Sequence, residues 1–431
     1  MSRPLRILVL GLHYAPESTG NAPYTTALAE GLTKRGHSVR VITAHPHYPE
    51  WRIRDGYGPQ TPHAHETRNG VPVTRLLHYV PPTPSHVQRL LSELSFGLRL
   101  VTTRWARPDV LLLVSPALFS TALALTRARL VHRRLPVGIW VQDLYSLGLA
   151  ETGTGTGRAT VIMRRIESAT LRHATSVAAI HDRFKLAMVR SLGVADATIH
   201  VIRNWTHLAE TPPFDRAAVR ARHGWSDTET IVLHAGNMGI KQGLENVVEA
   251  ARLADERQLP VRFVLLGGGN QRARLEQLAT GITRLQFLEA LPDADFQATL
   301  GSADVLLVNE LPGVTEMSVP SKLTSYFSTG LPVLGATDPT SVTAGELSVS
   351  GGGVRVNAGA PAALLDAVTT LAADPALCQK LGAAGLVHCR STLSAQAAVA
   401  RFEHWLVSLA SNSLTPQQAA TTPPDQRSNP Q

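Results

Sequence analysis

Two glycine-rich loops in the second half of the chain carry the residues best suited to bind an anion. They are "HAGNMGIKQG" (234–243) and "LLGGGNQRARLE" (265–276), and each follows an apolar run and precedes a helical pattern. Glycines let backbone N–H groups approach an anion at a helix start, where the helix dipole adds about half a positive charge. One such loop is equally consistent with a tight turn, but two in consecutive units favour a phosphate or nucleoside cradle. The candidate binding residues are Gly236, Asn237, Gly239, Lys241, Gly267 and Gly268.

A third loop, "NELPGVTEMSVPSKL" (309–323), groups polar residues before a helix predicted to begin near Pro320. The Glu316 carboxylate could accept hydrogen bonds from both hydroxyls of a ribose, and Lys322 could meet a phosphate. Ser321 stands beside Lys322 at the helix start, where backbone amides are available. The alternative is an ordinary helix N-terminus with a solvent-exposed lysine.

Two regions of the first half also carry candidate residues. The stretch 8–32, "LVLGLHYAPESTGNAPYTTALAEGL", reads as strand, loop and helix, with Gly20 and Asn21 just before Pro23. This loop is neither the dinucleotide fingerprint nor a P-loop. Asp143, in "WVQDLY", ends another predicted strand. Its carboxylate could orient the hydroxyls of a ligand, or it could simply cap a helix.

The elements that position these loops alternate between strand and helix. Apolar runs such as 6–12, 37–44 and 110–115 are separated by helical patterns or loops, and a helix is predicted from about 23 to 35. Continuous Val, Ile and Leu runs between helices are typical of a parallel sheet covered on both faces. The alternation lapses at 206–230 and then restarts. We therefore predict an α/β fold with two doubly wound domains, whose strand C-termini surround one cleft.

The predicted boundaries follow from this pattern. The N-terminal domain comprises residues 1–205 and the C-terminal domain residues 206–394, with long helical patterns at 361–388 and 395–410. The tail 411–431 is polar and rich in proline and glutamine, which is typical of disorder.

The charge is unevenly distributed over a net +8. Residues 1–205 carry 25 Lys and Arg against 12 Asp and Glu, whereas residues 206–431 carry 16 against 21. A basic half suggests an anionic partner. The basic residues are scattered arginines without aromatic interleaving, which argues against nucleic acid and favours anionic phospholipid. The two cysteines fit a reducing compartment, and no stretch reads as a signal peptide or a membrane span.

The segment 85–109, "SHVQRLLSELSFGLRLVTTRWARPD", is a candidate membrane contact. Leu90, Leu94, Leu98 and Val101 recur at helical spacing, and several arginines and one tryptophan accompany them. Basic amphipathic helices of this kind can lie on anionic bilayers. A helix packed on the sheet explains the same pattern equally well.

Seven stretches together resemble the GT-B glycosyltransferases of family 4, closest to the colanic-acid and exopolysaccharide group. They are "GLHYAPESTGNAPYTTALAEGLTKRGHSVRVIT", "HPHYPEW", "WVQDLY", "VIRNW", "GNMGIKQGLE", "LLGGGNQRARLE" and "SVPSKLTSYFSTGLPVLGA". The resemblance spans about residues 5–405. It implies two Rossmann-like domains facing across a cleft, with a nucleotide-sugar donor held mainly by the second, and a last helix that returns to the first.

The resemblance also implies an activity, namely transfer of a sugar from a nucleotide-diphosphate sugar with retention and without an essential metal or cofactor. Asp143 and Lys241 would be the catalytic residues, Lys322 would assist, and Gly20 and Asn21 would form the wall facing the donor phosphates. The acceptor would be a saccharide, lipid-linked in our interpretation, and the enzyme cytoplasmic and peripheral on the inner face of the membrane. No nucleic-acid partner is expected.

Two departures and two rival functions remain at this stage. Relatives often place a lysine where this chain has Gln242, and the second of the family's paired glutamates falls near Ser325. A GT-B nucleotide-sugar epimerase is one rival, and a non-catalytic protein that binds nucleic acid or another anion is the other. His45 and His47, and His63 and His65, invite a metal interpretation, but the prolines between them and the lack of cysteines favour loop histidines.

Overall fold

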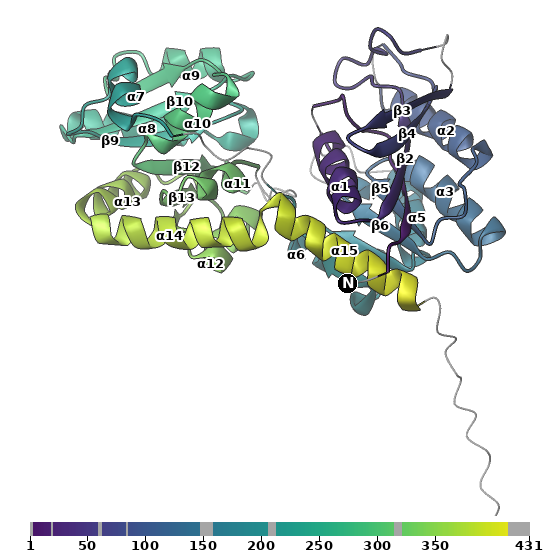
Figure 1. The fold of residues 1–431 in the computed structure, drawn as a ribbon. Helices are drawn as coiled ribbons and strands as arrows, with labels where there is room; N and C mark the ends of the chain where they lie inside the picture. Colours follow the sequence, from purple (N-terminus) through teal and green to yellow (C-terminus); the bar gives the residue numbers. More distant parts are fainter. Residues whose placement is uncertain are drawn as a thin grey trace, which may run out of the picture.

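The structure is a computed structural model that describes residues 3–18, 20–58, 63–82, 85–146, 158–205, 213–313 and 321–412. These residues form two α/β units, each on its own sheet, and the last helix runs from the second unit along the first (Figure 1). The predicted fold of two domains with mainly parallel sheets is confirmed. The predicted boundary between them, at 205/206, adjoins residues 206–212, which lie outside the described residues.

The first sheet has eight strands in the order β3-β4-β2-β1-β5-β6-β7-β8. They are β1 (Arg6–Leu10), β2 (Ser38–Ala44), β3 (His63–Arg68), β4 (Val71–Leu76), β5 (Val110–Ser115), β6 (Val137–Val141), β7 (Ser176–Ala179) and β8 (Ile199–Val201). All neighbouring strands are parallel except the antiparallel β3–β4 pair. Every residue of β5 and β6 is buried, as expected for strands covered on both faces.

The helices of the first unit follow the predicted alternation. They are α1 (Ala22–Lys34), α2 (His86–Thr102), α3 (Leu118–Val131), α5 (Arg158–Arg172) and α6 (Asp182–Leu192), with a 3-10 turn at Asp196–Thr198. The placement of His63 and His65 in a loop is wrong, because both belong to β3. This strand escaped prediction because its alternating residues are mostly polar, and only the Asn69–Gly70 turn signals the hairpin.

The second sheet is entirely parallel, in the order β11-β10-β9-β12-β13-β14. Its strands are β9 (Thr230–Ala235), β10 (Val261–Leu266), β11 (Leu285–Leu288), β12 (Val305–Asn309), β13 (Val333–Ala336) and β14 (Gly353–Val356). Because β9 lies between β10 and β12, the loops that follow these three strands leave the sheet side by side at its carboxyl edge. The first two predicted binding loops and the described start of the third, 309–313, are therefore neighbours.

The helices of the second unit are α7 (Arg216–His223), α8 (Glu245–Glu256), α9 (Arg272–Leu278), α10 (Asp293–Gly301), α11 (Ser321–Ser328), α12 (Val342–Ser350), α13 (Pro361–Ala373) and α14 (Pro375–Thr392). Three of them, α7, α10 and α12, are not among the helices predicted from the sequence. Helix α7 lies inside the segment interpreted as a connection. The single helix predicted over 361–388 is two helices, because Asp374 accepts a hydrogen bond from Leu377 N (2.9 Å) and Pro375 begins a new helix.

The last helix, α15 (Ala395–Asn412), fastens onto the first unit (Figure 1). Gly138 of β6 makes room for it, because a Cβ there would come within 2.7 Å of the Trp405 ring. Trp405 donates a hydrogen bond to Ser176 Oγ (2.9 Å), and Glu403 accepts one from Arg35 (2.5 Å). The helix includes Ser411 and Asn412, so the predicted start of the disordered tail at 411 is wrong by two residues. The remaining tail residues, 413–431, lie outside the described part.

A second contact joins the units next to the connection. Arg203 pairs with Asp182 of α6 at 2.8 Å and with the buried Glu346 of α12 at 2.7 Å. Of the helices in the described ranges, none combines the length and apolarity needed to cross a membrane.

Candidate active site

The loops after β9 and β10 touch each other through their backbones. Gly236 and Gly267 have φ angles of +125° and +124°, a region that side chains disfavour. A Cβ on Gly267 would lie 2.3 Å from the Gly236 carbonyl oxygen, so only glycine fits there. Gly268 accepts a hydrogen bond from Met238 N (2.8 Å), yet a Cβ on Gly268 would meet nothing within 4 Å. The joined loops thus leave the Gly268 backbone beside open space.

Lys241 lies on a 3-10 turn, η2 (Ile240–Gln242), within the first loop. The turn is closed by the Gln242 side chain, which accepts a hydrogen bond from Gly239 N (3.0 Å). Leu311 N donates to the Lys241 carbonyl oxygen (2.9 Å), which ties this turn to the loop after β12. The side chains of Lys241 and Asn237 are exposed. Gln242 stands where relatives often have a lysine. Its side chain stabilises the turn on which Lys241 lies.

Lys322 of α11 reaches the first loop from the other side. Its Nζ lies 3.0 Å from His234 Nε2, and a Cβ on Gly236 would come within 2.9 Å of its Cε. Burial, and then the Lys322 charge, hold the pKa of His234 well below its ordinary value. His234 is therefore neutral, and its Nδ1 lies 3.2 Å from the Leu307 carbonyl oxygen, to which it donates. Since Lys322 can only donate, Nε2 accepts, which positions the ammonium group over Gly236.

His234 was missed by sequence reasoning, because a histidine inside an apolar run reads as a core residue. For the other two candidate residues of the third loop, Ser321 and Glu316, the structure gives less information. Ser321 is the first residue of α11, and Glu316 lies outside the described residues. In the second unit the structure therefore brings together Gly236, Gly267 and Lys322, with Lys241 on the adjoining turn.

The first unit contributes Gly20 and Asn21 immediately before α1. Gly20 is exposed and has a φ of +62°, and the Asn21 side chain makes no cap hydrogen bond to the helix. Asn21 Oδ1 is buried without a hydrogen-bond partner among the described residues. The loop thus offers one positive-φ glycine and one amide oxygen at the carboxyl end of β1.

Asp143 follows β6 and is exposed. Its Oδ1 accepts a hydrogen bond from the adjacent Leu144 N (2.8 Å), whereas the next two amides are bound by another carboxylate: Tyr145 N and Ser146 N donate to Glu167 at 2.7 and 3.0 Å. Helix capping was the alternative role for Asp143. At the amides of Tyr145 and Ser146 it is Glu167 that accepts these hydrogen bonds instead.

Glu93 of α2 lies on the same side of the first unit and was also missed. The Tyr145 hydroxyl donates to Glu93 Oε1, and Phe119 N donates to its Oε2 (3.1 Å). Burial raises the pKa of Glu93 to about 7 despite these hydrogen bonds. In the sequence, Glu93 stands in "SELSF" within an amphipathic helical pattern. Such a pattern does not indicate that a carboxyl group is buried.

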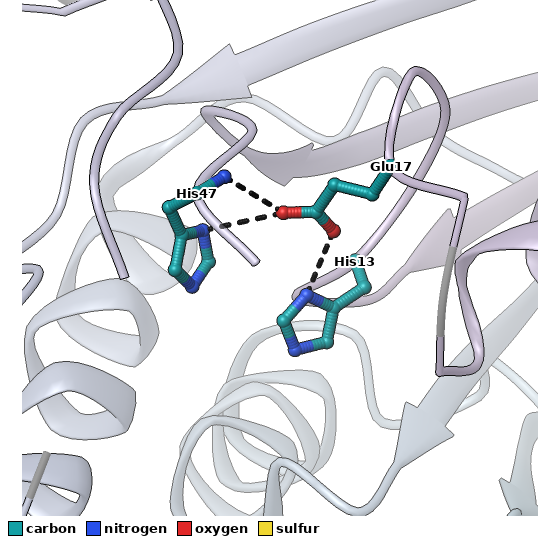
Figure 2. A group of neighbouring side chains, drawn as sticks. All are labelled: His13, Glu17 and His47. Atoms are coloured by element: carbon teal, nitrogen blue, oxygen red, sulfur yellow. Dashed lines mark hydrogen bonds and ion pairs between the residues drawn. The ribbon is translucent and has the colours of Figure 1, made fainter. Parts of the chain in front are cut away.

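A further acid and two imidazoles meet where the loops after β1 and β2 approach each other (Figure 2). Glu17 is 4% exposed, and its Oε1 accepts hydrogen bonds from His47 N (2.8 Å) and Tyr48 N (2.9 Å). Its Oε2 lies 2.8 Å from His13 Nδ1. Burial alone would raise the pKa of Glu17, but the His13 side chain and these amides lower it. Burial lowers the pKa of His47 to about 4, so this ring is neutral at physiological pH.

Comparison with known proteins agrees with this architecture. Residues 19–205 match the model of the glycosyl transferase 4-like domain, and residues 229–374 match that of glycosyl transferases group 1. Three solved structures share the fold at low sequence identity. They are Anabaena Alr3699/HepE in complex with UDP (TM-score 0.67, 16% identity, covering 94% of this chain and 100% of that one), sucrose-phosphate synthase from Thermosynechococcus elongatus (0.67, 18%, 94% and 100%), and WaaG, a glycosyltransferase involved in lipopolysaccharide biosynthesis (0.62, 15%, 93% and 99%). The two α/β units thus have the GT-B fold of these structures.

Closer relatives identify the family. The chain is 34% identical over 340 residues to WcaI of Escherichia coli (strain K12), which is named for glycosyl transfer in colanic acid biosynthesis. The aligned region covers 76% of this chain and 82% of WcaI. It is 26% identical over 238 residues to WbjE of Pseudomonas aeruginosa, named as a glycosyltransferase, which covers 54% and 58%. The chain therefore belongs to the group 1 glycosyltransferases that resemble WcaI, and it is an enzyme of this class.

Proposed function

We propose that this glycosyltransferase takes a sugar from a nucleotide-diphosphate sugar and transfers it, with retention of anomeric configuration, to a lipid-linked saccharide. The observation that carries the proposal is the edge of the second sheet, where two glycine loops in backbone contact lie beneath the ammonium group of Lys322. Glycine loops that allow a close approach, a helix start and two lysines suit a diphosphate better than a neutral ligand.

The chemistry follows from the charge that develops on the leaving diphosphate. As the bond from the anomeric carbon to the phosphate oxygen breaks, negative charge grows on that oxygen, and Lys241 and Lys322 stabilise it. The acceptor hydroxyl forms the new bond on the same face and gives its proton to the departing phosphate oxygen, so no protein base is required. Asp143 would orient sugar hydroxyls or stabilise the positive anomeric carbon. Gly20 and Asn21 would face the phosphates from the first unit.

The diphosphate can be held by these cations without a metal ion. Nucleotide affinity should therefore not change when EDTA or Mg²⁺ is added. Calorimetric titration of UDP, GDP and dTDP in both conditions tests this point, and an affinity that requires Mg²⁺ would contradict it.

The acceptor side of the proposal rests on the surface of the first unit. Helix α2 packs through Phe96 and Leu100, which are 0% and 2% exposed, while Val87, Leu91 and Leu98 are 64%, 49% and 59% exposed. The stripe predicted from the sequence is only partly exposed, because three of its four members are half-buried, namely Leu90, Leu94 and Val101. Exposed apolar side chains beside arginines in a half with an excess of basic residues suit an anionic membrane surface. We place the enzyme on the cytoplasmic face of the membrane, in exopolysaccharide or cell-surface polysaccharide biosynthesis, as the name of WcaI suggests.

The decisive experiment supplies donor and acceptor separately. A thermal-shift screen of UDP-, GDP- and dTDP-sugars identifies the donor, which is then incubated with lipid-linked saccharides from the host membrane. We expect one sugar added per acceptor, with the anomeric configuration of the donor retained by NMR. Conversion of the donor without any acceptor would indicate an epimerase instead, and an inverted product would remove the retaining mechanism.

Membrane contact is tested by charge reversal on α2 and just after it. Arg99→Glu with Arg104→Glu should reduce sedimentation with vesicles that contain anionic phospholipid. The matched control reverses two exposed arginines of the second unit, Arg257 and Arg274, and should leave sedimentation unchanged. Equal sedimentation of both double variants would remove the membrane surface from the proposal.

A further inference from the structure

The group formed by His13, Glu17 and His47 has donor atoms that the transfer reaction does not use. His13 and Glu17 stand in the loop after β1, and His47 stands in the loop after β2 (Figure 2). One ligand atom from each residue lies within 4.8 Å of the other two. His13 Nδ1 is 2.8 Å from Glu17 Oε2, and His47 Nδ1 is 3.5 Å from Glu17 Oε1. Residues 34 positions apart thus converge on one carboxylate.

We propose that His13 Nδ1, a Glu17 oxygen and His47 Nδ1 bind one divalent transition-metal ion of the zinc class. Two donors about 2.1 Å from a tetrahedral metal stand about 3.4 Å apart, which is close to the 2.8 and 3.5 Å that separate the two rings from the oxygens of Glu17. Two imidazoles and one carboxylate suit zinc, and also nickel or copper, better than Mg²⁺ or Ca²⁺, which prefer sets made entirely of oxygen.

The protons can be arranged for metal binding without changing the net charge of the rings. His47 Nδ1 now lies 2.9 Å from the His45 carbonyl oxygen and donates to it, and His13 Nδ1 donates to Glu17. A metal needs the lone pair on both atoms, so each ring must carry its proton on Nε2 instead. His47 Nε2 is buried and has no hydrogen-bond partner among the described residues. Because Nε2 is unpaired, moving the proton there breaks no hydrogen bond at that atom, and the exchange gives up only the bond from Nδ1 to the His45 carbonyl oxygen.

The surroundings fit a closed site with one entrance. The His47 ring packs against the rings of Trp51 and His78, at centroid distances of 5.9 and 4.7 Å. His13 packs against Tyr48 at 5.2 Å, and its side chain is 19% exposed. An ion could therefore enter on the His13 side, where a fourth ligand position stays open to solvent. Bound there, it would fasten the loops after β1 and β2 to each other.

The test is cobalt and zinc binding by the full chain without a polyhistidine tag. Protein stripped with a chelator is titrated with Co²⁺, and the visible absorption of four-coordinate cobalt is recorded. We expect one Co²⁺ per chain, displaced by one Zn²⁺. His13→Ala should weaken cobalt binding by more than about 100-fold, which exceeds the usual effect of a second-shell partner. His65→Ala, on the exposed edge strand β3, is the matched control and should change nothing.

Two further variants separate metal loss from misfolding. His13→Gln keeps a donor for Glu17 but removes the imidazole, and His47→Ala removes the second ligand. Both should lose cobalt binding while retaining the nucleotide affinity of the second unit. The proposal is overturned if the parent chain binds no cobalt, if His13→Gln binds it undiminished, or if His65→Ala loses it to the same degree.

Discussion

The carboxyl edges of the two sheets are built from different chemistry. In the second unit the edge is made of backbone: Gly236 and Gly267 bring two loops into contact, and Lys322 lies against Gly236 with Lys241 on the adjoining turn. In the first unit the edge carries ionisable side chains that bind one another or nearby amides, with Glu17 among the clearest. Both edges follow parallel strands, so the sheet supplies the place and the loops supply the chemistry.

The difference teaches what each half can recognise. Backbone amides and lysines attract any diphosphate and do not depend on the sugar, which suits the constant part of a donor. Carboxylates and imidazoles distinguish hydroxyl patterns and change with pH, which suits the variable part of a substrate or a bound ion. The four predictions below test this division, beginning with the largest expected effect.

Gly267→Ala should damage the second edge most. The new methyl group would lie 2.3 Å from the Gly236 carbonyl oxygen at a φ of +124°, so both loops must move. We expect a loss of about 3 kcal/mol in the free energy of unfolding and no measurable nucleotide binding. Gly268→Ala is the control, because nothing lies within 4 Å of its added carbon. Equal losses by denaturant unfolding in the two variants would show that backbone contact does not organise this edge.

Lys322→Ala should weaken nucleotide-diphosphate binding by about 100-fold, or roughly 2.7 kcal/mol. The reason is that Lys322 is positioned by His234 over Gly236, so little order is lost when the ligand binds. Lys241→Ala should cost about tenfold, because Lys241 is exposed and water screens its charge more than that of Lys322. Calorimetry with a nucleoside diphosphate and its nucleoside separates a phosphate effect from a base effect. A larger loss for Lys241 would reverse the assignment of the two lysines.

The second edge was the more predictable from sequence, for a physical reason. A glycine-rich loop between a strand and a helix is visible in the sequence itself, so Gly236, Gly267 and the strands before them could be found from local sequence. The supporting residues His234 and Gln242 could not be found in this way. The hydrogen bond of His234 joins segments far apart in the chain, and that of Gln242 depends on the exact path of its turn.

The first edge was less predictable because its pairs are non-local. Glu17 binds amides 30 and 31 positions away, and Glu93 reaches the Tyr145 hydroxyl 52 positions away. Rules based on the spacing of residues in the sequence predict neither contact. The polar strand β3 was missed for a related reason, since an edge strand need not show apolar alternation. Only "HYAPE", with a histidine and an acid four residues apart, carried a local sign.

Asp143→Asn tests whether the first edge acts on the sugar. The amide keeps the shape and can still accept the hydrogen bond from Leu144 N, so the fold should be unaffected. Losing the negative charge should lower turnover by about 10- to 100-fold while leaving donor affinity within about twofold. Steady-state kinetics and donor calorimetry on the same preparation give both quantities. A fully active variant would leave Asp143 as a residue of the surface only.

The smallest effect concerns Glu93, whose raised pKa links the stability of the first unit to pH. A carboxyl group whose pKa is raised from 4.5 to about 7 binds its proton more tightly in the folded chain than in the unfolded one. Its contribution to stability is therefore complete below pH 4.5 and is lost as the pH rises through 7. That range corresponds to about 3 kcal/mol. The fall in stability between pH 5 and 8 should therefore be shallower in Glu93→Gln.

The net gain for Glu93→Gln at pH 8 should be about 1 kcal/mol, because the uncharged amide avoids the cost of burial but makes poorer hydrogen bonds to Tyr145 and Phe119. Thermal unfolding of both chains at several pH values measures the slope and the offset. Glu256→Gln, at an exposed position of α8, is the control and should leave the slope unchanged. Parallel curves for Glu93→Gln and the parent would mean that this carboxyl group titrates normally, and the contrast between the two edges would then rest on Glu17 and Asp143 alone.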